Sequence, residues 1–269
     1  MYGNSIKSIA IGSFDGIHQG HQALINQVEA VVIVERNGGY LTPGYKRCLS
    51  VKQPCFFYHF EYIKALSAKA FVSKLKEDFP QLETIVVGYD FGFGYKKEGN
   101  TILLKTLFDG EVIVVEEVKS ENISVHSRTI KKYLTEGNIK MVNQLLGRSF
   151  MIGGQVISGQ GLGKKELVPT LNLNVYDYSL PKEGVYATRT KIGEVWLPSV
   201  SFLGHRVTTD GSYAIETHIL DKDIGAIFGS VWIEFIAFIR DNKKFDSLDA
   251  LKQVIGDDII EAKKMMALL

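Results

Sequence analysis

Cysteine, proline and net charge are all scarce in this sequence. Its 269 residues include two cysteines and six prolines, and 31 basic against 30 acidic side chains leave a formal charge of +1. Cys48 and Cys55 are too few for a disulfide scaffold or a zinc site, so we expect reduced thiols in a cytoplasmic protein. The near-zero charge gives no general attraction to nucleic acid or to a membrane surface, and we expect neither as a partner.

Long apolar runs are also missing. No run approaches the roughly 20 residues of a membrane span, and the N-terminus lacks the basic-then-apolar pattern of a secretion signal. The composition that remains, 45% hydrophobic and 23% charged, is typical of a globular protein. At this length, the chain can form one large domain or two ordinary ones.

The first half alternates strand-like and helix-like segments. Strands are predicted at 9–11, 30–35, 83–88 and 110–118, and helices at 22–29, 65–79 and 101–108. Residues 41–50 are predicted to be a loop, and 53–60 to be a strand or an aromatic wall. This alternation predicts a parallel α/β sheet that binds ligands at the carboxyl ends of its strands. Because loops 12–21 and 88–94 both follow such ends, we expect them on the same side.

The loop after the first strand reads Gly12-Ser-Phe-Asp-Gly-Ile-His-Gln-Gly-His21. His18 and His21 are three residues apart, so at a helix start they can point the same way, towards its positive end. Free N–H groups and two imidazoles there suit a phosphate, whose transfer depends on positioning and charge neutralisation. The alternative is a pair of surface histidines in a turn.

From Met151 the pattern changes to short strands separated by glycine turns. These strands are predicted at 151–157, 171–175, 184–191, 194–201, 212–220 and 229–240. Their spacing, with no helices between them, predicts an antiparallel barrel, closed by a helix at 248–266. We therefore predict two domains, residues 1–147 and 148–269.

Polar residues of the second half suggest a second phosphate site. Gly161 and Gly163 lie in a glycine loop followed by Lys164, and such a loop lets the backbone approach a phosphate. Thr170 and Asn172 are two apart on an extended chain, so their oxygens face one side and suit Mg²⁺ with ATP. Glu216 is the best candidate for a general base. Taken alone, Thr170 and Asn172 are more often solvated on an exposed strand face, and a glycine loop or a lone glutamate on a strand is a weak signal.

Several stretches also resemble one known family. In the first half, Gly12–His21, Val86–Gly94 and Val125–Lys131 resemble the signature loops of FMN adenylyltransferases. In the second half, 153–159, 169–172, 183–187 and 215–221 resemble motifs of riboflavin kinases. The whole chain thus resembles the bacterial bifunctional riboflavin kinase and FMN adenylyltransferases, usually called FAD synthetases.

This resemblance implies a Rossmann-like α/β nucleotidyltransferase domain followed by a six-stranded Greek-key barrel with a C-terminal helix. It implies that ATP and Mg²⁺ convert riboflavin to FMN in the barrel, and that a second ATP converts FMN to FAD with release of pyrophosphate. By motif it assigns catalysis to His18, His21 and Glu216; nucleotide and phosphate binding to Gly12, Phe14, Asp15, Gly20, Asp90, Ser127, Lys131, Gly161, Gly163 and Lys164; metal binding to Thr170 and Asn172; and flavin binding to Asp90 and Arg240.

The chain departs from the family pattern at a few of these places. Gly92 stands where the family has an arginine, and His126 and Arg128 replace small hydroxyl residues. Lys131 replaces an arginine and so gives up bidentate phosphate geometry. Two alternatives therefore stay open: a riboflavin kinase with a weakened first domain, and a flavin-sensing regulator without turnover. Oligomeric state, passage of FMN between the sites and the effect of Glu166–Val168 in the kinase flap are also open.

Overall fold

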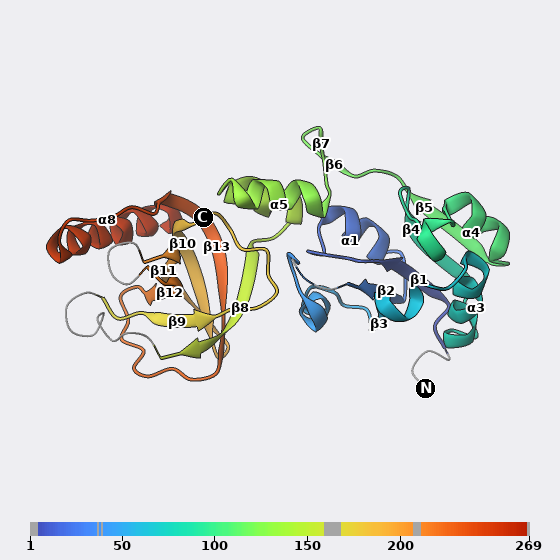
Figure 1. The fold of residues 1–269 in the computed structure, drawn as a ribbon, viewed down its shortest axis with the longest axis horizontal. Helices are drawn as coiled ribbons and strands as arrows, with labels where there is room; N and C mark the ends of the chain where they lie inside the picture. Colours follow the sequence, from blue (N-terminus) through green and yellow to red (C-terminus); the bar gives the residue numbers. More distant parts are fainter. Residues whose placement is uncertain (1–4, 37, 39, 159–167, 207–210, 268–269) are drawn as a thin grey trace. The chain divides into compact units, whose positions relative to one another are not determined.

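The chain folds into two compact units, residues 1–129 and 130–269 (Figure 1). The computed structural model describes residues 5–36, 38, 40–158, 168–206 and 211–267. Helix α5 (Ser127–Thr135) spans the division, and helix α6 (Ile139–Leu146) packs on strands of the second unit. Within the described residues, no helix combines the length and the apolarity needed to cross a membrane.

The first unit is built on a parallel sheet of five strands in the order β3-β2-β1-β4-β5. Its strands are β1 (Ser8–Gly12), β2 (Ala30–Glu35), β3 (Cys55–His59), β4 (Thr84–Gly88) and β5 (Glu111–Val115). Between them lie α1 (Gln19–Ile25), the 3-10 helix η1 (Gly44–Ser50), α2 (Phe60–Ile63), α3 (Ala68–Asp78), the 3-10 turn η2 (Tyr95–Lys97) and α4 (Thr101–Leu107), and a small hairpin of β6 (Lys119–Ser120) and β7 (Ile123–Ser124) follows. The predicted α/β sheet is confirmed.

Alternation along the strands gives this sheet two apolar faces. Ile9 and Ile11 of β1 pack with α3 and α4, whereas Ala10 between them packs with α1 on the opposite face. Successive side chains of a strand point to opposite sides, so a strand buried on both faces is a continuous apolar run. Phe14 and Ile17, from the loop after β1, belong to the α1-side core, so this loop is part of the packed interior.

Two local differences from the predictions matter for the site. Helix α1 begins at Gln19 and ends at Ile25, earlier than the predicted span of 22–29. Residues 41–50, predicted to be a loop, contain the 3-10 helix η1. A 3-10 helix of seven residues is too short to show a repeated apolar face, so the sequence pattern did not reveal it.

The second unit is a closed antiparallel barrel in the order β10-β11-β12-β9-β8-β13. Its strands are β8 (Phe150–Ile157), β9 (Leu171–Asn174), β10 (Gly184–Ile192), β11 (Val195–His205), β12 (Tyr213–Ile219) and β13 (Ser230–Asp241), and α8 (Leu248–Ala267) follows them. All six predicted strands are present within a few residues of their predicted ends. Helix α8 packs on β10, β11 and β13.

A closed ring of hydroxyl groups lies inside this barrel. Thr188, Thr190, Ser199, Ser201 and Thr217 are each 0% exposed. Around the ring the oxygen–oxygen distances are 2.8 Å from Thr188 to Ser199, 2.8 Å from Ser199 to Thr190, 3.1 Å from Thr190 to Thr217, 2.9 Å from Thr217 to Ser201 and 2.8 Å from Ser201 back to Thr188. Buried hydroxyls that satisfy one another in this way tie together strands β10, β11 and β12.

We predict that Ser199→Ala destabilises the barrel by about 1–3 kcal/mol, because Thr188 and Thr190 each lose one of their two buried hydrogen bonds. Both tryptophans, Trp196 and Trp232, lie in β11 and β13 of the barrel, so urea unfolding followed by tryptophan fluorescence reports on this unit. Thr135→Ala is the matched control, because its hydroxyl is exposed and bonds within its own helix. Equal midpoints for the two variants would contradict a stabilising role for the ring.

Candidate active sites

The loop between β1 and α1 is sharply wound and anchored from within. Phe14 and Ile17 adopt positive φ values of 49° and 43°, and Gly16 lies between them at 87°. Non-glycine residues in this region carry a conformational cost, which is typically met at functional sites by the surrounding structure. Here burial of the Phe14 and Ile17 side chains supplies that compensation. The predicted site residue Phe14 also packs under Gly12, where a Cβ would lie 3.3 Å from its ring.

His18 and His21 lie together, as predicted. His18 is the N-cap of α1, and its Nδ1 accepts a hydrogen bond of 3.2 Å from the backbone N–H of His21. The two imidazole rings stack, with centroids 3.5 Å apart and planes 17° apart. Since Nδ1 of His18 is an acceptor, the proton of its neutral ring belongs on Nε2. His18 therefore offers an N–H donor on the side away from its own helix cap.

His21 is held as a neutral ring. Burial lowers its pKa well below 6.5, and the electrostatic effects of the neighbouring His18, His126 and Arg47 lower it further. Among the described residues, its Nδ1 is a buried nitrogen with no hydrogen-bond partner. Buried polar atoms normally have a partner, so this nitrogen is well placed to interact with a bound polar group.

Two small residues bring another segment against the histidines. A Cβ on Gly20 would lie 3.2 Å from the His18 ring and 3.2 Å from the carbonyl oxygen of Val125. Ser127 donates from Oγ to the backbone oxygen of Asp15 at 2.8 Å. The start of α5 is thereby fixed to the loop between β1 and α1, called the motif loop below. Lys131 lies one turn further along α5.

The loop after β4 follows the strand that pairs with β1. The chain passes from β1 to β2 on one side and returns to β4 on the other, so both loops flank a topological switch point, where open α/β sheets bind ligands. Asp90 is exposed there and folds back over Gly88, where a Cβ would lie 3.3 Å from its Oδ1. Gly92 contacts the stem of Lys97, so a basic side chain lies beside the residue that replaces arginine.

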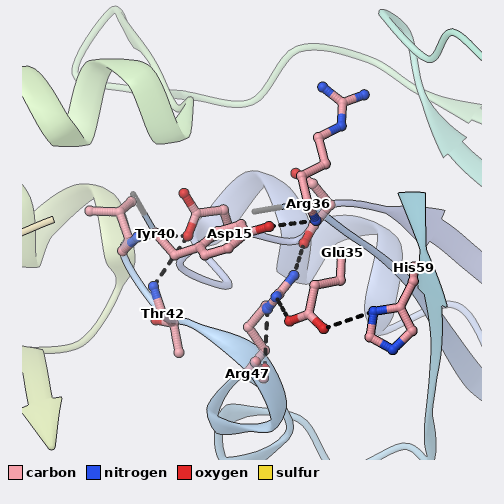
Figure 2. Close-up of polar contacts among 10 residues, drawn as sticks. Asp15, Glu35, Arg36, Tyr40, Thr42, Arg47 and His59 are labelled. Carbon is pink, nitrogen blue, oxygen red and sulfur yellow. Dashed lines mark hydrogen bonds and ion pairs between the residues drawn. The ribbon is translucent and has the colours of Figure 1, made fainter. Parts of the chain in front are cut away.

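A buried arginine, missed by the sequence analysis, braces the motif loop (Figure 2). Arg47 of η1 is 0% exposed. It donates from Nη1 to the carbonyl oxygen of Ser13 at 2.8 Å, from Nε to that of Gly44 at 3.2 Å, and from Nη2 to Glu35 Oε1 at 2.7 Å. Glu35 ends β2 and also faces His59 Nδ1 at 3.6 Å. One guanidinium thus joins the end of β2, the η1 segment and the motif loop.

Asp15, within the motif loop, binds the backbone of the segment that precedes η1. Its Oδ1 accepts from the backbone N–H groups of Leu41 at 2.7 Å and Thr42 at 3.2 Å, and the residue is 5% exposed (Figure 2). In this structure the carboxylate therefore fixes the segment before η1. Its predicted contact with the nucleotide stays a prediction.

In the second unit, strand pairing brings two predicted residues face to face. Asn172 of β9 and Glu216 of β12 are register partners. Arg206 connects them, because its Nη2 lies 2.7 Å from Asn172 Oδ1 and 2.6 Å from Glu216 Oε1. Thr170 is half-buried just before β9. Gly161, Gly163 and Lys164 lie outside the described residues.

Arg240 lies apart from this group. It is on β13, which neighbours β8 and β10 in the barrel but neither β9 nor β12. Its guanidinium makes a bidentate pair with Asp258 of α8, at 2.8 Å from Nε to Oδ1 and 2.7 Å from Nη2 to Oδ2. The observed contact ties the C-terminal helix to the barrel, and a flavin contact stays a prediction.

Two models of known protein families match separate parts of this chain. A riboflavin kinase model matches residues 146–266, and an FAD synthetase model matches residues 3–36 and 48–129. The segment 37–47, which contains Arg47, falls between the two matched stretches of the second model.

Individual proteins match this chain over nearly its full length. A protein of Buchnera aphidicola subsp. Acyrthosiphon pisum, named bifunctional riboflavin kinase/FMN adenylyltransferase, is 31% identical over 97% of this chain and 94% of its own. One of the same name from Listeria monocytogenes is 30% identical over 98% and 93%. A crystal structure described as a macrolide-efflux protein from Streptococcus pneumoniae shares 26% identity with a TM-score of 0.84, and covers 97% of this chain and 95% of that one.

We predict that the ring of His21 stays neutral in the folded protein well below pH 6.5. Because the folded-state pKa lies below the unfolded value, the unfolded chain binds a proton that the native chain excludes. The stability contributed by this histidine is complete above pH 6.5 and is lost as the pH falls below it. Nitrogen chemical shifts of the imidazole, followed by NMR titration, measure the ionisation directly. Titration near 6.5 in both the native and the urea-unfolded chain would refute the assignment.

We predict that Arg47→Lys destabilises the first unit by about 2–4 kcal/mol, because lysine cannot replace the three-way fork and Glu35 loses part of its pairing. The slowest-exchanging amides of β1 and β2 should then lose protection from hydrogen exchange, while barrel amides serve as an internal standard. Arg36→Lys is the matched control, since Arg36 is exposed and stacks over Phe60. Unchanged protection in Arg47→Lys would show that the fork is dispensable.

Proposed function

This chain belongs to the bifunctional riboflavin kinase/FMN adenylyltransferase family, and we propose that its two units divide the two reactions between them. The chain converts riboflavin to FMN and FMN to FAD, with ATP as co-substrate. We assign adenylyl transfer to residues 1–147 and phosphorylation to residues 148–269. The observation that carries this division is that the stacked histidine pair lies within the FAD synthetase match, whereas Glu216 and its partners lie within the riboflavin kinase match.

In adenylyl transfer, a phosphate oxygen of FMN attacks the α-phosphorus of ATP, and pyrophosphate leaves. Negative charge grows on the oxygens of that phosphorus, so donors fixed before the reaction stabilise the transition state. We assign that role to Nε2–H of His18 and to the ring of His21. A neutral His21 suits the task in the free enzyme, because burial of the ring disfavours its charged form. No covalent intermediate is required.

The remaining motif residues would surround the nucleotide. Backbone groups of the wound loop would approach the phosphates, and Ser127 and Lys131 would contact them from α5. The full assigned set is Gly12, Phe14, Asp15, Gly20, Asp90, Ser127 and Lys131, with Asp90 also near the flavin. Lys97, packed along Gly92, supports retention of positive charge where the family has an arginine.

In phosphorylation, the 5′-hydroxyl of riboflavin attacks the γ-phosphorus of ATP and must lose its proton. Glu216 is our candidate to accept it, since a positioned carboxylate within hydrogen-bond reach is a suitable general base. Gly161, Gly163 and Lys164 would contact the ATP phosphates, and Arg240 would contact the flavin.

The residues present fit a magnesium ion held jointly with ATP. Mg²⁺ commonly takes few protein oxygens and completes its shell with water and substrate phosphates. Among the described residues no cluster of three or more His, Cys, Asp or Glu side chains could hold a metal alone. Asn172 Oδ1 already binds a cation, the Arg206 guanidinium, so its surroundings suit positive charge. Thr170 and Asn172 would hold the ion, which when bound neutralises charge on the phosphate oxygens.

We place both reactions in the cytoplasm, without a nucleic-acid partner. The two cysteines are free thiols, and burial together with the neighbouring Cys48 raises the pKa of Cys55 to about 12. A buried thiol with a high pKa is unreactive, which agrees with a structural role for the pair.

Two reciprocal substitutions test the division. Glu216→Gln should lower the rate of FMN formation by about 100-fold or more, and leave FAD formation from supplied FMN intact. His18→Asn retains a good helix cap but removes the imidazole. It should therefore lower FAD formation from FMN and leave FMN formation from riboflavin intact. Flavin chromatography after incubation with ATP, Mg²⁺ and either riboflavin or FMN measures both products.

The unmodified chain should give FAD from either substrate. Loss of both activities in a single folded variant would contradict separate sites. FMN accumulation without FAD from the unmodified chain would instead favour the kinase with a weakened first domain.

A further inference from the structure

Arg206 is the most heavily engaged side chain beside the proposed kinase site. It lies just beyond β11 and reaches three side chains, those of Asn172, Ser212 and Glu216. Nε donates to Glu216 Oε1 at 2.7 Å, Nη1 to Ser212 Oγ at 2.8 Å and Nη2 to Asn172 Oδ1 at 2.7 Å. Charge-assisted hydrogen bonds of this length are among the stronger polar contacts in proteins.

The contacted atoms are the ones that the proposed reaction needs. Nε and Nη2 both approach Glu216 Oε1, at 2.7 and 2.6 Å, which accounts for both lone pairs of that oxygen. Asn172 Oδ1 is bound to the same guanidinium. A substrate hydroxyl and a metal ion therefore compete with Arg206 for these oxygens.

The backbone around Arg206 is fixed independently of its side chain. Its N–H donates to the carbonyl oxygen of Ser212 at 2.9 Å, and its own carbonyl oxygen accepts from Gly211 at 3.1 Å. The side chains of Arg206 and Glu216 are 18% and 25% exposed, so the guanidinium borders solvent. It can therefore leave both oxygens by rotamer change, while these two backbone hydrogen bonds stay in place.

We propose that Arg206 is the resting-state cation of the kinase site: it neutralises Glu216 and occupies Asn172 Oδ1 in the free enzyme, and metal–nucleotide binding displaces it. This inference rests on the proposed function of the site. While Arg206 is in place, the site cannot accept the metal, so the apparent affinity for the metal–nucleotide complex equals the intrinsic affinity multiplied by the fraction of molecules in which the guanidinium has moved away. Arg206 thus prevents the base and the metal ligand from being available before ATP arrives.

A purely structural brace would behave differently. If Arg206 only supported Glu216 and the turn, removing it would loosen the site and weaken binding of the metal–nucleotide complex. If it is a displaceable cation, removing it frees Asn172 and strengthens binding. The sign of the change in affinity separates the two roles.

The test is calorimetric titration of the full chain with Mn²⁺ and ADP, without riboflavin. Arg206→Gln should bind Mn²⁺–ADP about 10-fold more tightly at the kinase site, which corresponds to the low end of the range for hydrogen bonds to a charged group. Ser212→Ala removes one anchor of the guanidinium and should give a smaller gain. Arg189→Gln is the matched control, because that arginine pairs with Glu234 at 3.4 Å away from the site.

Asn172→Ala identifies the relevant binding event, since the first unit also binds nucleotide. The gain caused by Arg206→Gln must vanish in the double variant Arg206→Gln/Asn172→Ala. Unchanged or weaker binding in Arg206→Gln, with thermal unfolding unaltered, would overturn the displaceable cation while leaving the kinase site in place. If the unmodified chain shows no binding that depends on Asn172, the site assignment itself fails, and this inference with it.

Discussion

A single buried guanidinium holds the histidine loop of the first unit in place. Arg47 has no exposed surface, yet it reaches the loop that carries both histidines, the end of β2 and its own 3-10 helix. A buried charge is stable only when its partners are complete, so these three segments hold one another in a single arrangement. The strained turn at Phe14 and Ile17 depends on that arrangement and on the core below it.

The two sites use arginine in different ways. In the first unit, the Arg47 guanidinium binds backbone oxygen and a carboxylate, so it supports the loop and leaves the two histidines open. In the second unit, Arg206 binds the proposed base and the proposed metal ligand themselves and is partly exposed. A buried, fully paired arginine suits permanent support, whereas an arginine at the border of solvent can exchange its partners.

Elements with a repeated pattern were predictable from the sequence. Continuous apolar runs, as at Ile9–Ile11 and Ala30–Glu35, indicate strands that are buried on both faces. Alternation, as along Ala214–Leu220, indicates a strand that is buried on one face. His18 and His21 were found because helical spacing brings them together locally. Arg47 and Arg206 were not found, because their partners lie far along the chain or across the barrel and no periodicity encodes such contacts. Asp15 shows the same limit: its bonds to residues 41 and 42 follow from the fold.

The hydroxyl ring of the barrel has a further consequence. Five hydroxyls carry five protons and make five bonds, so each must donate once and accept once, and all donors must point in the same sense around the circle. The circuit is therefore homodromic, and because Ser201 donates to Thr217, that one bond sets the direction of the other four. The hydroxyl dipoles of the barrel interior thus follow one another head to tail, so each bond polarises the next and the loss of any one hydroxyl weakens the whole circuit.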